Sequence, residues 1–301
     1  MKIKKIILSY EELKLEPKAL IAMTSLRQSE FEALLVDFTV AWNETTGSDP
    51  SKGGRPPVIK TMADRLLFIL FYLKTYPLQE VIAHLFGLSQ PQANFLIHRF
   101  SAVLSKALEA GGHRPARLTD EMTARLSEEM PQKLGIDGTE RRVQRPQDPV
   151  GQRGHYSGKK KCHTVKNSLI CGLEDRQVKY LGPTHEGKKH DKKLCDEEDI
   201  RLPEGTELYR DSAYQGHEVP GTTVHQPKKK PRGGTLSAED KAENRFISGI
   251  RVIVEHIIAG IKRCRIVKDV FRNTKEGFDD LAMELACSLH NYRSSCRYQS
   301  Y

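Results

Sequence analysis

The sequence predicts an all-α N-terminal part followed by an α/β part, and two observations support this division. Apolar residues recur at helical spacing through most of the first 130 residues, whereas short apolar runs of strand length begin only after Pro131. Helical patterns return after these runs, at 240–267 and 278–293. Strands mixed with helices in this way are typical of a domain with a central mixed sheet.

The first strong helical pattern covers residues 25–45. Ser29 and Glu32 predict a capping box at its start. Its apolar residues recur at helical spacing and are Phe31, Leu34, Leu35, Phe38 and Trp42. Since such a stripe usually packs inward, we expect Trp42 to lie in the core. A second, strongly apolar helix is predicted at 64–74, ending before Pro77.

Residues 78–98 have the pattern of a helix-turn-helix. A short helix is predicted at 78–86, Gly87 can form the tight turn, and Ser89 can cap a second helix. In this motif the second helix enters the DNA major groove. The candidate DNA contacts at its start are Gln90, Gln92, Asn94 and His98. A plain helical hairpin that only packs is the alternative interpretation.

These patterns predict four segments. The first is an N-terminal helical segment, 1–50, and the second is the helix-turn-helix region, 51–112. A connector at 113–132 follows, with a helix predicted from Thr119 to Met130. The α/β domain would cover 133–301, with strands at 134–137, 164–172, 177–181 and 207–210 and a helix at 192–199.

Three acidic residues of the α/β domain stand where carboxylates are structurally awkward. Asp137 and Asp211 each close a short apolar run, and Glu255 interrupts the apolar residues of a helix. A lone carboxylate held against apolar surface is costly unless it is paired or binds a cation. Three that converge would form an oxygen-rich site that suits a hard divalent ion such as Mg²⁺.

Two basic residues accompany Glu255 along the same helix. Arg251 lies four residues before it and Lys262 seven residues after it. These offsets bring the three side chains close to one helix face. Cations that flank a carboxylate on one stripe fit a phosphodiester better than they fit a core.

These residues resemble the motifs of the DDE transposases of bacterial insertion sequences, in the branch with a ribonuclease-H-like catalytic domain. The spacing of Arg251, Glu255 and Lys262 is similar to that family's third motif. Further similar segments follow one another between about residues 133 and 295. They are Asp137–Glu140, Tyr156–Asn167, His190–Lys193, Gln226–Gly233 and Leu289–Arg293.

The resemblance implies an enzyme that cuts DNA strands at the ends of an element and joins them to target DNA. It implies two Mg²⁺ ions, with Mn²⁺ as a substitute, held by Asp137 as the bridging ligand and by Asp211 and Glu255 as ligands of one ion each. Arg251 and Lys262 would contact phosphates. A homodimer on double-stranded DNA is expected, because joining two ends requires two active sites.

Two acidic residues near these motifs have open roles. Glu140 is expected to orient its loop or to bind a lysine, not to hold metal. Asp191 could pair with His190 beside the site or could cap a helix, and the sequence favours neither.

The net charge of +9 is unevenly distributed. Residues 1–50 are slightly acidic, whereas 151–193 carry an excess of seven positive charges. Basic clusters around the acidic motifs are the electrostatic footprint of a polyanion. The lysines expected to follow the DNA backbone are Lys159, Lys160, Lys161, Lys228, Lys229 and Lys230.

Composition excludes several classes of protein. No apolar stretch is long enough to span a bilayer, and the six cysteines show no zinc-ligand spacing. We therefore expect a soluble bacterial protein of the cytoplasm, bound to the nucleoid when it is on DNA. Two alternatives to a transposase stay open: a domesticated nuclease that cuts without joining, and a DNA-binding regulator without catalysis.

Overall fold

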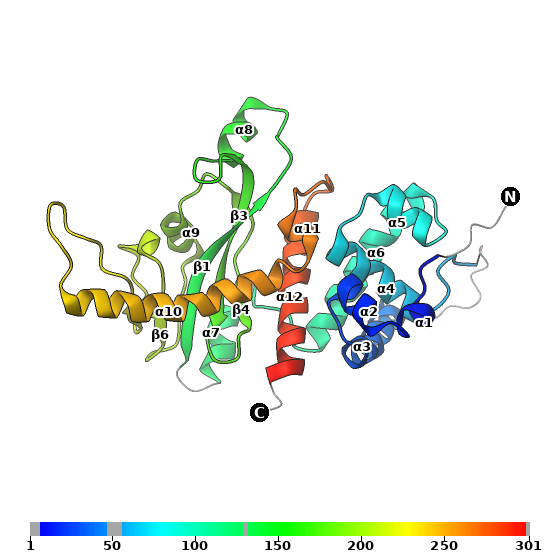
Figure 1. The fold of residues 1–301 in the computed structure, drawn as a ribbon, viewed down its shortest axis with the longest axis horizontal. Coiled ribbons are helices and arrows are strands. Elements are labelled where there is room, and N and C mark those ends of the chain that lie inside the picture. The colour runs from blue at the N-terminus through cyan, green and yellow to red at the C-terminus, as the bar shows by residue number, and fades with distance from the viewer. Residues whose placement is uncertain (1–6, 47–55, 129–131, 299–301) are drawn as a thin grey trace.

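The structure is a computed structural model that describes residues 7–46, 56–128 and 132–298. Figure 1 shows a bundle of helices on one side, a sheet with its covering helices on the other, and α12 (Phe278–Tyr298) standing between them. The predicted fold class is confirmed: an all-α region precedes an α/β region with a mixed, ribonuclease-H-like sheet.

The helical region is built around α4 (Met62–Thr75), in which every residue from Leu66 to Leu73 is buried. Against it pack helices from both sides of the chain. They are α1 (Tyr10–Leu13), α2 (Pro17–Thr24), α3 (Gln28–Thr46), α6 (Gln90–Ala110) and α11 (Arg265–Lys268), and α5 (Gln79–Leu85) packs against α6. α7 (Thr119–Ser127) follows and packs against the α/β region.

The helix-turn-helix is formed by α5 and α6. Gly87 makes the turn with φ of 67°, a left-handed conformation that glycine adopts without a Cβ clash. Ser89 and Gln92 form a capping box at the start of α6. The sequence-based prediction of both helices and of the turn is confirmed here.

The start of α3 differs from the prediction. Ser29 lies inside the helix, and the backbone N–H of Arg27 donates instead to Glu30 Oε2 at 2.8 Å, so the predicted capping box of Ser29 with Glu32 is wrong. Glu30 also accepts from Arg297 of α12 at 2.7 and 2.8 Å. The tertiary contact with α12 thus selects which acid serves the helix start.

The sheet centres on β1 (Lys133–Arg142). It pairs antiparallel with β3 (Cys162–Gly172) and parallel with β6 (Glu207–Tyr209), which pairs parallel with β7 (Thr223–His225). Three further strands pair with β3: β2 (Tyr156–Ser157), β4 (Val178–Leu181) and β5 (His185–Glu186). The loop before β2 contains α8 (Pro149–His155), at the top of Figure 1.

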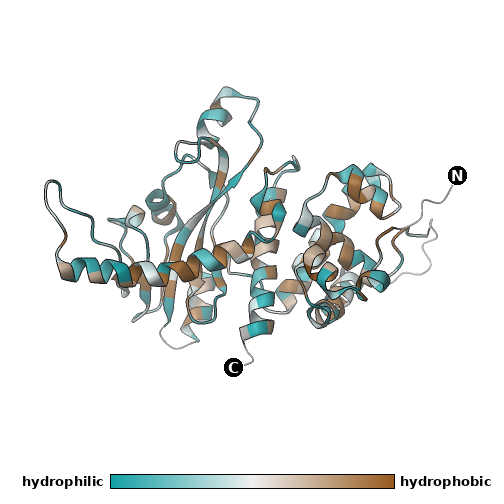
Figure 2. Cartoon of the chain, in the orientation of Figure 1, coloured by the Kyte–Doolittle hydropathy of each residue, from teal (hydrophilic) through white to brown (hydrophobic). Residues whose placement is uncertain are grey.

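One face of the sheet is covered by α10 (Ala238–Ile261), which crosses β1. Figure 2 shows that α10 is hydrophilic where it projects beyond the sheet and hydrophobic where it covers the strands. At the crossing, Val254 occupies the space that a side chain at Gly135 would take. Two neighbouring elements complete this region, α9 (Asp191–Glu198) and the 3₁₀ turn η1 (Ser212–Tyr214).

The long C-terminal helical pattern is interrupted. The helix predicted over 240–267 ends at Ile261, Lys262 takes the C-cap position, and α11 (Arg265–Lys268) follows as a separate turn. The helix predicted from Thr119 to Met130 begins at Thr119 and ends at Ser127, and Met130 lies outside the described residues.

A continuous buried core joins the two regions. Phe271 stacks on Tyr76 with ring centroids 6.3 Å apart, and Arg272 donates to the carbonyl oxygens of Tyr76 and Pro77. From the N-terminal segment, the carbonyl of Glu30 accepts from the hydroxyl of Tyr292 at 2.5 Å. The predicted domain boundaries therefore stay predictions, since no break in the core marks them.

In the described part of the chain, no helix is both long and apolar enough to cross a membrane.

The environment of His290 leads us to predict that the stability of the protein depends on pH. Its Nε2 lies 2.9 Å from the carbonyl of Arg176, and burial lowers the pKa of its imidazole to about 4. Below about pH 6.5 the imidazole of His290 is protonated in the unfolded chain but not in the native state. The free energy of unfolding therefore falls by up to about 3 kcal/mol as pH drops to 4. Urea unfolding across this range measures the loss.

The matched variants are His290→Gln and His84→Gln. His84 is exposed on α5, so its replacement should keep the wild-type pH dependence. His290→Gln should flatten that dependence, and equal slopes for both variants would contradict the assignment.

Candidate active site

The register of the sheet brings Asp137 and Asp211 together. In the parallel pair of β1 and β6, Gly135 pairs with Tyr209, an offset of 74 residues. Asp211 follows Asp137 by the same 74 residues, so continuing the register for two residues sets the two aspartates side by side. Because strand side chains alternate, Asp137 shares the face of Gly135, the face that α10 covers.

The surroundings of Asp137 disfavour the ionised form of its carboxyl. Burial raises the pKa of its carboxyl, and the nearby carboxylates of Asp191 and Asp211 push it the same way. The backbone N–H of Gly138, which donates to Asp137 Oδ1 at 2.7 Å, and the guanidinium of Arg251 oppose this shift. The site therefore concentrates negative charge where little water can screen it.

Asp211 caps the short turn η1 after β6. Its Oδ1 accepts from the backbone N–H of Ser212 at 2.5 Å, and its Oδ2 lies 3.0 Å from Nη2 of Arg251. Arg251, predicted to contact a phosphate, thus contacts one of the predicted metal ligands. The ion pair anchors α10 over the end of β6.

Glu255 lies one turn beyond Arg251 on α10. Its side chain is exposed, whereas Val254 and Ile257 face the core, so the expectation that its carboxylate is held against apolar surface is wrong. The reason is the position of Glu255 around the axis of α10, because the stripe of Arg251, Glu255 and Lys262 runs along the border of the buried face of the helix. Both flanking members reach the aspartates, since Arg251 pairs with Asp211 and Lys262 interacts with Asp137.

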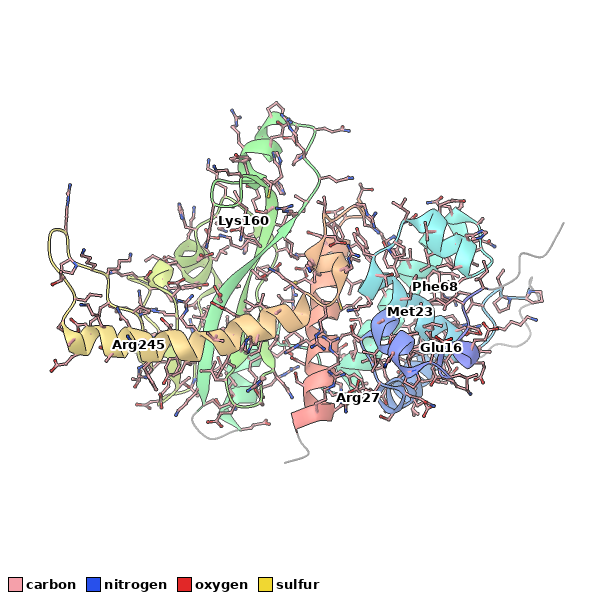
Figure 3. The ribbon with its side chains drawn as sticks, in the orientation of Figure 1. Glu16, Met23, Arg27, Phe68, Lys160 and Arg245 are labelled. Atoms are coloured by element: carbon pink, nitrogen blue, oxygen red, sulfur yellow. The ribbon has the colours of Figure 1, made fainter. Side chains whose placement is uncertain are left out.

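Lys262 brings positive charge to the same place. Burial lowers the pKa of its ammonium, as does the nearby Lys160, while Asp137 and Glu140 favour its charged form. Lys160 belongs to the exposed turn between β2 and β3, above the sheet in Figure 3, with Lys159 and Lys161. Lys160 and Lys262 therefore lie close to each other, with Lys262 beside Asp137.

Two residues beside Asp137 were left open or missed by the sequence, Asp191 and Tyr214. Asp191 Oδ1 lies 3.0 Å from Nζ of Lys166 and 2.8 Å from the position of a Cβ on Gly138. His190, not Asp191, takes the cap position of α9, so the capping role is wrong. Tyr214 is 1% exposed, and within the described chain its hydroxyl has no hydrogen-bond partner. The residue types gave no signal, because the packing of α9 against β3 and η1 creates this neighbourhood.

Glu140 binds a lysine, as predicted. Its Oε1 lies 3.7 Å from Nζ of Lys166, and its Oε2 accepts from the hydroxyl of Thr164 at 3.1 Å. Lys166 therefore links Glu140 to Asp191 beneath the site.

The second lysine cluster lies elsewhere, beside the projecting end of α10 where Figure 3 labels Arg245. Lys228 is engaged in ion pairs with Asp240 at 2.8 Å and Glu243 at 3.0 Å. Lys229 and Lys230 are exposed.

In the helix-turn-helix, the candidate DNA contacts differ in availability. Gln90 donates to Gln79 at 2.5 Å, and Gln92 accepts from the backbone N–H of Ser89 at 2.9 Å. His98 packs edge-on against Phe278. Asn94 lines a shallow groove that α6 forms with residues 273–275.

The donor set suits a hard divalent cation in part. Asp137 and Asp211 supply carboxylate oxygens on one face of the sheet, and a cation between them would offset the burial and the carboxylate repulsion that together raise the pKa of Asp137. Across residues 7–46, 56–128 and 132–298, no three His, Cys, Asp or Glu side chains cluster closely enough to hold a metal ion. That Glu255 joins the two aspartates stays a prediction.

Comparison with known proteins agrees with this geometry. Residues 136–291 match the DDE superfamily endonucleases, whose members generally use divalent metals, and residues 61–110 match the helix-turn-helix of the same superfamily. A probable transposase for insertion sequence element IS702 from Microchaete diplosiphon is 27% identical over 242 residues, which cover 80% of this chain and 83% of that protein.

A second relative is a putative transposase for insertion sequence element IS112 from Streptomyces albus G. It is 25% identical over 256 residues, covering 84% of this chain and 87% of that protein. No solved structure matches the chain. The match over 136–291 takes in the paired aspartates and the helix that crosses them, and this chain belongs to the DDE superfamily endonucleases.

Proposed function

We propose that this chain is the transposase of an insertion sequence. It would bind the ends of its element, cut DNA strands there and transfer the freed ends into target DNA, in the bacterial cytoplasm on nucleoid DNA. The observation that carries the proposal is the pairing of Asp137 with Asp211 under the Arg251 stripe of α10. The names of the two relatives support the same activity.

In this proposal the carboxylates of Asp137, Asp211 and Glu255 hold Mg²⁺, replaceable by Mn²⁺, with two ions bound. When bound, the metal would supply activation of the attacking hydroxyl and charge stabilisation of the leaving oxygen of the phosphodiester. Asp137 would be the ligand shared by the ions, and Asp211 and Glu255 would be ligands of one ion each, as the family resemblance implies. The chain's own contribution is to hold these oxygens in place on a rigid strand pair.

Arg251 and Lys262 have different tasks. Arg251 fixes the carboxylate of Asp211 through its ion pair, so it orients the site before it meets any phosphate. Lys262 carries its charge next to Asp137 and Lys160, where a phosphodiester placed on the carboxylates would be neutralised. Lys159, Lys160 and Lys161 extend this charge outward along the DNA path.

DNA binding would begin at the helix-turn-helix. Asn94 is the best placed of the predicted readers, since Gln90 and Gln92 already serve local hydrogen bonds. Of the second lysine cluster, Lys229 and Lys230 are better placed for phosphates than Lys228. A homodimer on DNA is proposed because two ends must be joined by two active sites.

The test is strand cleavage of a DNA fragment that carries the element's own ends, in Mg²⁺. Wild type should cut at the ends, and Glu255→Gln should cut roughly a hundredfold more slowly or not at all, the scale of losing one charge-stabilising group. Glu239→Gln is the matched control, because Glu239 is an exposed acid on the same helix. It should cut like wild type.

Other outcomes separate the alternatives. If wild type and Glu255→Gln both bind the ends and neither cuts them, the chain is a DNA-binding regulator. Cutting without transfer of the freed 3′ end to target DNA would indicate a nuclease.

A further inference from the structure

A second site lies in the helical region, far along the chain from the paired aspartates. An open cavity of about 650 Å³ lies beside α6. Its walls come from α3, α4, α6 and the segment at 56–59, and they include Trp42, Pro56, Pro57, Arg65, Phe95 and Arg99. The volume is within the range of small-molecule sites, and apolar side chains form much of the wall. Trp42, predicted to be core, is thus only partly buried.

Two guanidinium groups converge on the indole of Trp42. The guanidinium carbon of Arg65 lies 4.4 Å from the ring centroid and that of Arg99 lies 4.5 Å from it. Arg65 also donates to the carbonyl of Ile59 at 3.2 Å. Among the described residues neither arginine forms an ion pair with a carboxylate, unlike Arg251 at the catalytic site.

Like charges held together without an acid create a site for an anion. Burial and then the charge of Arg99 lower the pKa of Arg65, so the two cations repel each other in the free protein. An anionic group between them would remove that repulsion. Arginine is suited to this task, because its planar fork binds phosphate and its face stacks on rings.

The cavity is placed where DNA is expected. Phe95 and Arg99 belong to α6, the second helix of the helix-turn-helix, and Phe95 is 61% exposed. The same two residues border the groove that contains Asn94 and the exposed Lys275. An exposed phenylalanine and an arginine on this helix would both lie at a DNA surface.

We propose that the cavity binds one unstacked nucleotide of the DNA, with its base among Trp42, Phe95 and the prolines and its phosphate between Arg65 and Arg99. Phosphate alone would leave the apolar walls unused, and a paired base cannot enter a concave pocket. Aromatic and guanidinium surfaces together are the chemistry that binds splayed bases. The inference rests on the proposed DNA-end binding and adds a strand-distorting step to it.

Trp42 is the only tryptophan, so intrinsic fluorescence reports on this cavity directly. The full chain is titrated with a short oligothymidylate, with a duplex that carries one unpaired thymidine, with the fully paired duplex and with inorganic phosphate. We expect saturable quenching by the first two probes only. Quenching by the paired duplex or by phosphate to the same extent would overturn the proposal.

Variants test the residues. Arg99→Gln should weaken oligothymidylate binding roughly ten- to a hundredfold, the range for losing one hydrogen-bonded charge partner of the phosphate. Arg99→Lys keeps the charge and loses the planar face, so it should also bind weakly. The control Lys106→Gln removes an exposed charge from the same helix and should bind like wild type. If Arg99→Gln matches this control, the cavity is not the site.

The two proposals fail separately. Cleavage of the element's ends with no fluorescence response would refute the nucleotide site and leave the transposase intact. Quenching by the oligonucleotide without any cleavage of the element's ends would refute the transposase and leave the nucleotide site intact.

Discussion

Replacing Gly135 with alanine is expected to abolish DNA cleavage and to lower stability by about 1–3 kcal/mol, the usual cost of overpacking a core. A Cβ at Gly135 would lie 2.3 Å from Cγ2 of Val254 and 3.2 Å from Cδ2 of Leu173. Since β1 is fixed in the middle of the sheet, α10 must move away. Arg251 and Glu255 would move with it, and a shift of about 1 Å can cost a hundredfold in rate.

The same contact offers a rescue. Val254→Ala removes the clashing Cγ2, and the Cβ that remains lies 3.8 Å from the new carbon, an ordinary contact. The double variant should therefore recover cleavage and much of the stability, which a double-mutant cycle measures by urea unfolding and end cleavage. Gly249→Ala is the control, because nothing lies within 4 Å of its added carbon on the same helix. Normal cleavage by Gly135→Ala alone would show that α10 needs no close approach.

The local parts of the site could be predicted because they depend on spacing along one element. The stripe of Arg251, Glu255 and Lys262 follows from helix geometry, and the ends of β3, β4 and β6 were predicted to within two residues, whereas β1 continues five residues past its predicted end at Asp137. The offset of 74 residues was also visible in the sequence. Its meaning was not, because only the paired structure shows that β1 and β6 have the same offset.

The wrong predictions concern residues whose contacts are determined by a charged partner on another part of the chain. Ser29 and Glu32 have the capping-box pattern, but Arg297 holds Glu30 and shifts the helix start. Asp191 was a candidate helix cap, but its carboxylate forms an ion pair with Lys166 of β3. Lys228 looks like a DNA contact, yet two acids of α10 pair with it. In each case the competing charge lies far away in sequence, where no pattern of one segment can reveal it.

The prediction that Trp42 packs inward is confirmed only in part, because the residue lies at the edge of the core. Its stripe does pack inward: Phe31, Leu34 and Phe38 are fully buried. Trp42 lies in the last turns of α3, at the edge of the core, where one side of its ring packs edge-on against the buried Phe100 and two arginines meet the ring as well. A periodic pattern predicts which face is buried and not how far along the helix the burial extends.

Asp137→Asn is expected to abolish cleavage and yet to raise the melting temperature by on the order of 2–4 °C near neutral pH. Burial raises the pKa of this carboxyl above its unfolded value. Such an acid costs nothing when it is protonated in both states, and the cost grows as pH rises from the unfolded to the folded pKa. Above the folded pKa the full penalty is present, and asparagine removes it while Oδ1 still accepts from Gly138.

Asp211→Asn is the matched comparison, since both variants lose a carboxylate of the same site. Asp211 is more exposed and is paired with Arg251, so removing its charge forfeits an ion pair and should not raise the melting temperature. Thermal melts of both variants near pH 7 and near pH 4 decide the point. The gain of Asp137→Asn should shrink in acid, and a melting temperature below wild type at neutral pH would mean that the Asp137 carboxylate is already compensated. A stabilised, inactive Asp137→Asn would show that this strand keeps a costly charge for catalysis and not for folding.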